Sequence, residues 1–308
     1  GNELWEKAVS QTGRHSWSLT PFNRAIRQTT GTGKRGLYAS VFQQWQQQWR
    51  AQDERLQKSV VDSLTRHGNE YLNFKYPQAI DSQMIVAEMT GPGIVRQFVR
   101  IDALSGRYEA FHVPGTRDDA PFSVSQGMMT WAELEPHWRW ENQMFGNIYL
   151  MNLFSGQTKR LTSRGRYFAP ALNSEGSHLA AVFVGDDHRN AIHLLNLDGE
   201  LLESIATPDN DFPVTPVWSE ATHDWVMVLL NDDGKRLVAL NPINQSWRDI
   251  THASFTQMRL PKVVGDEVYF TSSVTGIENI FKVALDGGEP TQVTSSRFGA
   301  AGAIAWTP

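Results

Sequence analysis

A segment that recurs about every 45 residues constrains this chain more than any other feature. Four similar stretches lie at residues 147–153, 191–197, 236–241 and 279–285. Each is followed by a turn and a further strand-like stretch that ends in threonine: Thr162, Thr207, Thr251 and Thr294. Apolar residues alternate within each unit rather than following a helical period, which excludes a helical solenoid. Four short strands in a unit of this length predict a β-propeller blade.

The start of each unit carries a proline that precedes a small polar turn and an apolar strand. These prolines are Pro77, Pro121, Pro170, Pro216 and Pro261. About five four-stranded blades fit between Tyr71 and Thr294. The stretch 303–306 repeats the pattern of 215–218, which predicts the start of a sixth blade. Because an unclosed ring exposes sheet edges, we expect either an arc that lacks blades or a strained closure by the C-terminal strand.

The first 66 residues have a helical period instead. Thr20 followed by Pro21 is typical of a helix start, and Gly31 of a helix end. A longer helix carries an apolar face made of Leu37, Val41, Phe42, Trp45 and Trp49. The helical region is too small to bury much on its own and is expected to pack on something else. The predicted organisation is therefore a helical segment, 1–66, as the tail of an upstream domain, and a β-propeller, 67–308, truncated at its C-terminus. The fold class is mainly β.

Composition excludes several classes of protein. The net charge is −5 with both signs scattered along the chain, whereas nucleic-acid binding requires a concentrated basic patch. Cysteine is absent, which excludes disulfides, thiolate catalysis and cysteine-ligated zinc. No apolar run is long enough to predict a membrane span, and the sequence shows no charged-then-apolar pattern of the kind that predicts a secretory leader. The 11 tryptophans and 15 phenylalanines are expected mainly to fill cores.

Several phrases carry a family resemblance. The blade starts at 169–176 and 217–220 resemble the P-x-W-S-P-D-G pattern of TolB-like propellers. Residues 268–281 look closer still to the propellers of large bacterial envelope proteins, in which a zinc-peptidase domain of the peptidase MA type precedes a TolB-like propeller. Residues 22–27 and 42–45 are similar to the last helices of that peptidase domain. The resemblance implies a place in the periplasm or cell envelope of a Gram-negative bacterium.

The chain departs from that family where catalysis is concerned. None of the nine histidines belongs to an H-E-x-x-H motif, so no zinc role transfers to a residue of this chain. The glycine-rich stretch 30–36 has Arg35 where a phosphate-binding loop needs Ser or Thr, and it follows a helix. No serine lies in a G-x-S-x-G elbow. No catalytic residue, metal ligand or cofactor is therefore predicted.

The densest cluster of reactive side chains lies in the link between two strands of the second blade. Its members are Glu133, Glu135, His137, Arg139, Trp140 and Glu141. Such a mixture could form a ligand-contacting loop at the mouth of the propeller. The alternative is an extended hairpin whose charges pair across the strands and whose Trp138 and Trp140 pack on a neighbour. The acidic turns 186–187 and 209–211 lack the alternating spacing of a calcium loop, so solvated turns are expected.

Three functions stay open from the sequence. The first is a non-catalytic binding or scaffold propeller of a cell-envelope protein, which presents a face to a protein or peptide. The second is an accessory, substrate-gating part of a zinc metallopeptidase whose catalytic motif lies upstream. The third is a propeller with its own carboxylate site acting on glycans, which predicts carboxylates within roughly 10 Å of one another in the central channel.

Overall fold

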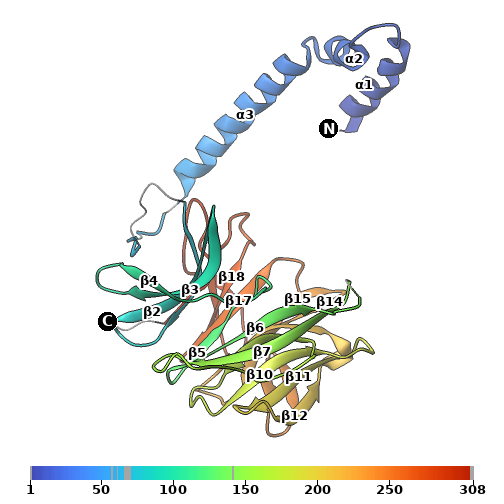
Figure 1. Cartoon of the computed structure of the whole chain (residues 1–308). Helices are drawn as coiled ribbons and strands as arrows, with labels where there is room; N and C mark the ends of the chain where they lie inside the picture. The colour runs from blue at the N-terminus through green and yellow to red at the C-terminus, as the bar shows by residue number, and fades with distance from the viewer. Residues whose placement is uncertain (1, 57, 61, 66–70, 141, 306–308) are drawn as a thin grey trace. The chain divides into compact units, whose positions relative to one another are not determined.

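The computed structural model describes residues 2–56, 58–60, 62–65, 71–140 and 142–305. The chain divides into two compact units, Gly1–Gln57 and Lys58–Pro308. The first is helical and the second is built from β-strands (Figure 1). Among the described residues, no helix has the length and apolar character that crossing a membrane requires.

The described helices of the first unit are α1 (Asn2–Arg14), α2 (Pro21–Thr30) and α3 (Lys34–Arg55). As expected, α2 begins after Thr20 with proline in its first turn and ends at Gly31. Gly31 has a left-handed backbone, φ 77°, and its N–H donates to the Arg27 carbonyl oxygen at 2.9 Å. Helices α1 and α2 pack together, with the rings of Trp5 and Phe22 stacked at 6.1 Å.

Helix α3 carries a stripe of four aromatic rings that the structure leaves exposed. Tyr38, Phe42, Trp45 and Trp49 contact one another in sequence, with ring centroids 4.2, 6.2 and 5.7 Å apart. All four are at least 42% exposed. The rings stack along the helix and enter no core among the described residues, and the expectation that this region packs on another part of the protein stays a prediction.

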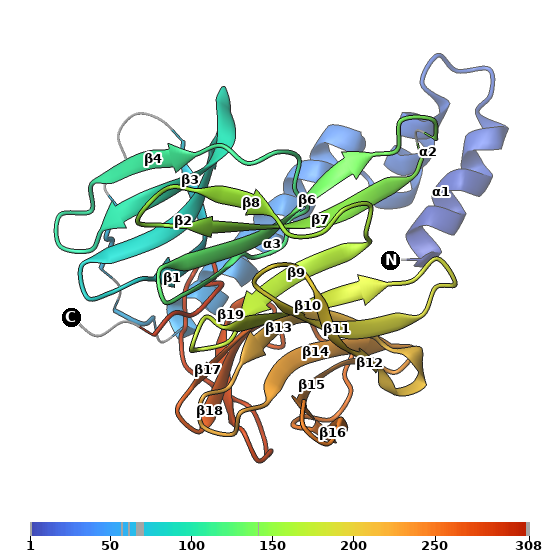
Figure 2. The same cartoon turned by 60° about the horizontal axis from the view of Figure 1, so that its bottom comes forward.

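The strands of the second unit form five antiparallel four-stranded sheets in the described part of the chain, one for each predicted unit (Figures 1 and 2). Blade 1 contains β1 (Asn73–Ala79), β2 (Met84–Gly91), β3 (Ile94–Asp102) and β4 (Tyr108–His112). Blade 2 contains β5 (Ser123–Ser125), β6 (Met128–Pro136), β7 (Met144–Asn152) and β8 (Thr158–Arg160). Blade 3 contains β9 (Tyr167–Leu172), β10 (His178–Val184), β11 (Asn190–Asn196) and β12 (Leu201–Ala206).

The chain then continues through a short 3₁₀ turn, Pro208–Asn210, into the last two sheets. Blade 4 contains β13 (Phe212–Trp218), β14 (Trp225–Asn231), β15 (Gly234–Asn241) and β16 (Ser246–Asp249). Blade 5 contains β17 (Met258–Val264), β18 (Glu267–Ser272), β19 (Asn279–Ala284) and β20 (Thr291–Gln292). Strand order follows chain order in every sheet, which confirms the predicted five-bladed propeller.

The recurring threonines close the third strand of a blade. The backbone N–H groups of Ile148, Leu237 and Ile280 each donate to a threonine Oγ1 at 2.9 Å. The acceptors are Thr162, Thr251 and Thr294 respectively. A hydroxyl therefore satisfies a backbone donor at the same place in three blades, which gives this sequence repeat its physical cause.

The recurring prolines mark a bulge in the innermost strand. In four blades the residue before the proline has a left-handed backbone: Tyr76 (φ 54°), Ala169 (φ 42°), Thr215 (φ 51°) and Leu260 (φ 53°). The ladder to the second strand skips this residue and the proline in each case. Proline has no N–H to donate, so a bulge accommodates it inside a strand. In blade 2 the proline precedes the short strand β5.

Apolar clusters fill the junctions between successive blades. Trp131 and Phe98 join blades 1 and 2, and Leu150 and Leu179 join blades 2 and 3. Trp225 lies between blades 3 and 4. Between blades 4 and 5, Met258, Val268 and Phe270 form one cluster with Val226 and Val228. The core is thus distributed around the ring.

Blades 5 and 1 meet at a seam that two further segments of the chain cover. Gly302 N–H donates to Thr271 Oγ1 of blade 5 at 3.0 Å, while Ile304 packs on the apolar face of blade 1. Ser59 N–H donates to the Ser295 carbonyl oxygen at 2.9 Å. The predicted sixth-blade strand is therefore wrong for residues 303–305, which cross the seam without forming a strand ladder; residue 306 lies outside the described residues.

Candidate functional site

The innermost strands surround an axial channel. Its wider part is a cavity of 550 Å³, here called the proline chamber, which is lined by all five recurring prolines, Pro77, Pro121, Pro170, Pro216 and Pro261. The same cavity is lined by small polar residues such as Ser123, Ser125 and Asn173. The prolines therefore do more than mark the blades in the sequence, because they bring one position of every blade to one cavity.

A second cavity of 380 Å³, the mouth chamber, continues the channel. The two chambers share a ring of residues, here called the collar: Tyr76, Pro121, Ala169, Thr215 and Leu260. In blades 3, 4 and 5 the inner strand passes from the mouth chamber through the collar to the proline chamber, as Val214, Thr215 and Pro216 do in blade 4. The collar contains the four left-handed bulge residues, so the strained backbone lies where the chambers meet.

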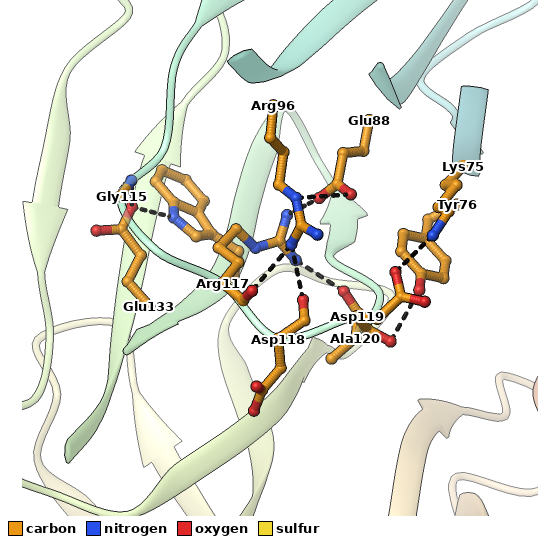
Figure 3. Close-up of polar contacts among 11 residues, drawn as sticks. Lys75, Tyr76, Glu88, Arg96, Gly115, Arg117, Asp118, Asp119, Ala120 and Glu133 are labelled. Carbon is orange, nitrogen blue, oxygen red and sulfur yellow. Dashed lines mark hydrogen bonds and ion pairs between the residues drawn. The ribbon is translucent and has the colours of Figure 1, made fainter. Parts of the chain in front are cut away.

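A buried ionic cluster holds one side of the mouth chamber in place (Figure 3). Glu88 on β2 has a completely buried side chain, and its Oε2 lies 2.7 Å from Arg117 Nη1. Arg96 Nε lies 3.5 Å from the other carboxylate oxygen. Burial raises the pKa of Glu88 even though both arginines oppose that change. A buried carboxylate of this kind requires its cationic partners.

The same arginines fix the link between β4 and β5, which forms the chamber wall. Arg96 Nη1 donates to the carbonyl oxygens of Arg117 and Asp118 at 3.0 Å each, and Arg117 Nη2 donates to that of Ala120 at 2.8 Å. Asp119 of the same link is held as well, because its carboxylate accepts a hydrogen bond from Lys75 Nζ at 2.8 Å. Figure 3 shows these groups converging on the link from β1, β2 and β3. The wall is therefore preorganised by charge-assisted hydrogen bonds.

Two pKa values report this environment. Burial raises the pKa of the Tyr76 hydroxyl well above its ordinary range, and this hydroxyl donates to the Asp119 carbonyl oxygen at 2.8 Å. Burial would also raise the pKa of the Asp119 carboxyl, but the hydrogen bond from Lys75 and the charges of Lys75 and Arg96 hold that pKa below its ordinary value. At neutral pH the wall therefore presents a neutral phenol and an ionised carboxylate.

The mouth chamber is also lined by basic residues. Lys235 and Arg259 both line it, together with Gln257. Arg259 makes two hydrogen bonds to the Glu278 carboxylate, at 3.0 and 2.5 Å, whereas Lys235 donates to the side-chain oxygen of Gln257. Burial, followed by the neighbouring Arg259 charge, lowers the pKa of Lys235. The chamber is thus lined by both acidic and basic side chains.

The two glutamates predicted for the β6–β7 hairpin are engaged separately. Glu133 Oε1 accepts from the Gly115 N–H at 3.0 Å and from the Trp131 indole N–H at 2.7 Å. Glu135 pairs with Arg160 at 2.9 Å and accepts from the Tyr149 hydroxyl at 3.1 Å. Glu135 is tied to its own blade and Glu133 also to the β4–β5 link, and neither lines the described channel. Their arrangement is that of structural partners rather than an acid–base pair.

Hydrogen bonds to His137 hold the tip of that hairpin. The His137 Nδ1 accepts from the backbone N–H groups of Arg139 and Trp140, both at 3.1 Å. The Arg139 guanidinium lies over the Trp140 ring at 5.1 Å. Trp138 and Trp140 are 82% and 58% exposed, so the expectation that they pack on a neighbour is not met in the described chain. Glu141 lies outside the described residues, and a ligand-contacting role for this tip stays a prediction.

The acidic turns form ordinary ion pairs. Asp187 lies 3.4 Å from Arg189, and Asp211 lies 2.7 Å from Arg236. Within the described ranges, no group of three His, Asp or Glu side chains is arranged to hold a metal ion.

The contrast between two buried tryptophans gives a testable prediction. Trp131 and Trp225 are both fully buried, but only the Trp131 indole N–H has an acceptor among the described residues. Replacing Trp131 with Phe is therefore expected to destabilise the fold by about 1.5 kcal/mol more than replacing Trp225 with Phe, because the first loses a hydrogen bond to a carboxylate. Urea unfolding of both variants measures the difference. Equal losses would show that the Glu133 contact contributes little.

Together the sheets and the channel define a five-bladed β-propeller with a two-chambered axis. No protein-family model and no curated protein matches the chain. Several solved structures are similar to the chain. A putative TolB from Agrobacterium tumefaciens has a TM-score of 0.55 at 13% identity, over 75% of this chain and 84% of its own. TolB from Acinetobacter baumannii has a TM-score of 0.53 at 12% identity, over 70% of this chain.

The match spans only 53% of the Acinetobacter TolB chain. An oligogalacturonate lyase in complex with manganese is similar as well, with a TM-score of 0.51 at 13% identity, over 74% of this chain and 66% of that one. Since these structures include both TolB proteins and an enzyme, they establish a TolB-like propeller fold without assigning an activity.

The channel residues Asp118, Asp119, Lys235 and Gln257 were not predicted from the sequence. One signal was present: Asp118 and Asp119 directly precede a recurring proline. Because the residue just before each recurring proline lines the mouth chamber, charged residues at this place in the repeat fall near the channel. Lys235 carries no comparable mark, since it begins the third strand of its blade.

Proposed function

We propose that this chain is a non-catalytic binding propeller of a bacterial envelope protein, and that it takes an extended peptide segment of a partner into its axial channel. The observation that carries the proposal is the collar, where four inner-strand bulges take backbone groups out of the sheet ladders beside the channel. An extended peptide offers donors and acceptors that complement such groups. The preorganised mouth supports binding with little ordering cost.

The channel gives less support to a glycan-acting site. Three carboxylates line it: Asp118, Asp119 and Glu220. Glu220 belongs to the proline chamber, and Asp119 is neutralised by Lys75. A pair with one carboxylate on each side of a sugar is therefore not the arrangement that the described residues present.

A plug variant tests the proposal. Ala221 is exposed and lines the proline chamber, so Ala221→Trp places a large ring there without disturbing a core. Ala110→Trp, on the exposed outer strand β4, is the matched control. Peptides selected from a random display library with free C-termini should bind the native chain and the control equally, and the plug variant at least about tenfold more weakly. Selected peptides that bind all three equally would contradict channel binding.

A further inference from the structure

The mouth chamber combines an apolar surface with charge. Its apolar lining consists of Phe168, Val182, Phe212, Val214, Met258 and Leu260. Phe212 is 39% exposed, so part of this surface is open to a ligand. A concave apolar site with a few polar groups on its wall is the usual form of a small binding pocket.

Lys235 is the polar group in this chamber that lacks an opposite charge. In the described part of the chain, no carboxylate lies within ion-pair distance of its ammonium group, whose partner is the neutral amide of Gln257. The next residue provides the contrast. Arg236 pairs with Asp211 at 2.7 Å and with Asp249 at 2.9 Å, so the nearby carboxylates are already used.

The backbone holds Lys235 in position. Its N–H donates to the Ser254 carbonyl oxygen at 2.8 Å, and its own carbonyl oxygen accepts from the Ser254 N–H at 2.9 Å. Gln257 and Arg259 then follow on the adjoining segment, where Glu278 binds Arg259 at 2.5 Å. An ammonium group fixed in this way beside an apolar surface is preorganised for an anion, and an anionic ligand would replace the solvation that burial removes.

We propose that the mouth chamber binds the C-terminal carboxylate of a peptide whose last side chain is large and apolar. The carboxylate pairs with Lys235, the side chain covers Phe168, Phe212 and Met258, and the preceding residues extend through the collar. This inference deepens the proposed function and rests on it, because it names the end of the peptide that the channel receives.

The charge in the chamber favours a carboxylate over a phosphate. A phosphate carries nearly two negative charges and is usually held by several cations or by a bidentate arginine. Here the charge of Arg259 is compensated by Glu278, and Asp118 and Asp119 line the same chamber. One uncompensated cation next to an amide therefore matches a single negative charge.

The test compares two forms of one peptide. A fluorescein-labelled octapeptide ending in phenylalanine is made with a free C-terminal carboxylate and with a C-terminal amide, and binding to the whole chain is measured by fluorescence anisotropy. The native chain should bind the carboxylate form about tenfold more tightly or better. Lys235→Met keeps the aliphatic stem and should bring the two affinities within about twofold, while Lys235→Arg should retain the preference.

Two further variants locate the effect. Lys159→Met removes an exposed lysine that pairs with Asp198, and the carboxylate preference should be unchanged. Lys262→Met removes the lysine of the proline chamber. If the preference disappears in Lys262→Met but survives in Lys235→Met, the carboxylate binds in the other chamber and the inference is overturned.

The outcome also separates the inference from the proposed function. Equal binding of the acid and amide forms, with both weakened by Ala221→Trp, would overturn the carboxylate site and leave channel binding intact. Failure of the octapeptide to bind, together with failure of the library to yield any peptide sensitive to the plug, would overturn the proposed function itself.

Discussion

Replacement of Arg117 with methionine is expected to lower the free energy of unfolding by about 3–5 kcal/mol at neutral pH. Arg117 Nη1 lies 2.7 Å from the fully buried Glu88 carboxylate, and its Nη2 holds the Ala120 carbonyl oxygen. Its loss leaves a buried charge whose remaining cation, Arg96, lies 3.5 Å away. Urea unfolding of the native and variant chains measures the loss. A loss below about 1 kcal/mol would show that water or Arg96 fully replaces Arg117.

The loss should shrink as the pH falls. Burial raises the pKa of folded Glu88 above its ordinary value of 4.5, and removal of Arg117 raises it further. A raised folded-state pKa means that the folded chain binds the proton of Glu88 more tightly than the unfolded chain does. The contribution of Glu88 to the free energy of unfolding is therefore greatest below the unfolded-state pKa, and it is lost as the pH rises through the folded-state pKa. The difference in unfolding free energy between the native and Arg117→Met chains should therefore be smaller near pH 5 than at pH 7.

A double variant provides the control for the pair. In Glu88→Met with Arg117→Met both charges are removed, so the unfolding free energy should recover most of the loss seen with Arg117→Met alone. A double variant as unstable as the single one would show that Arg117 acts through the carbonyl of Ala120 rather than through Glu88.

Replacement of Trp225 with alanine is expected to cost about 3–5 kcal/mol. Trp225 is fully buried and packs between blades 3 and 4, with its ring 4.9 Å from that of Trp218. Alanine would leave a cavity at a junction that two rigid sheets cannot close by small movements. Thermal and urea unfolding of the variant check the prediction.

Trp138→Ala is the matched control, because this tryptophan is 82% exposed on the β6–β7 hairpin. Its replacement should change stability by no more than about 0.5 kcal/mol. Comparable losses for the two variants would contradict the burial that distinguishes them.

Most of the fold could be predicted because its signals are local and repeated. The hydroxyl of a recurring threonine accepts a hydrogen bond from a backbone N–H in three blades, and in four blades the recurring proline lies at a bulge of the inner strand. Closure of the ring could not be predicted in the same way. It depends on contacts such as Ser59 with Ser295, whose partners lie far apart in the chain and belong to no repeat.

The candidate site was less predictable for a related reason. The hairpin residues Glu133 to Trp140 stand out because charges and rings are dense in a short stretch, yet the structure gives Glu133 and Glu135 separate local partners. The channel is assembled from one short stretch of each blade. Glu88 and Arg117 are 29 residues apart, and no composition or period links them.

The role beside an upstream zinc peptidase stays a prediction, as does the envelope location. Both depend on sequence outside this chain. An H-E-x-x-H motif within about 150 residues upstream in the gene would support the accessory role, because that motif supplies two zinc ligands and a general base. Its absence from that region would contradict the role.

The common direction of the inner strands makes the two openings of the channel chemically unequal. One opening carries Lys235 beside an apolar surface, and the other is lined by the recurring prolines and small hydroxyl side chains together with Lys262 and Glu220. A peptide that binds in the channel should therefore do so in one N-to-C direction only. A peptide with the reversed residue order has the same composition but the opposite order of side chains along the channel, so it should not bind.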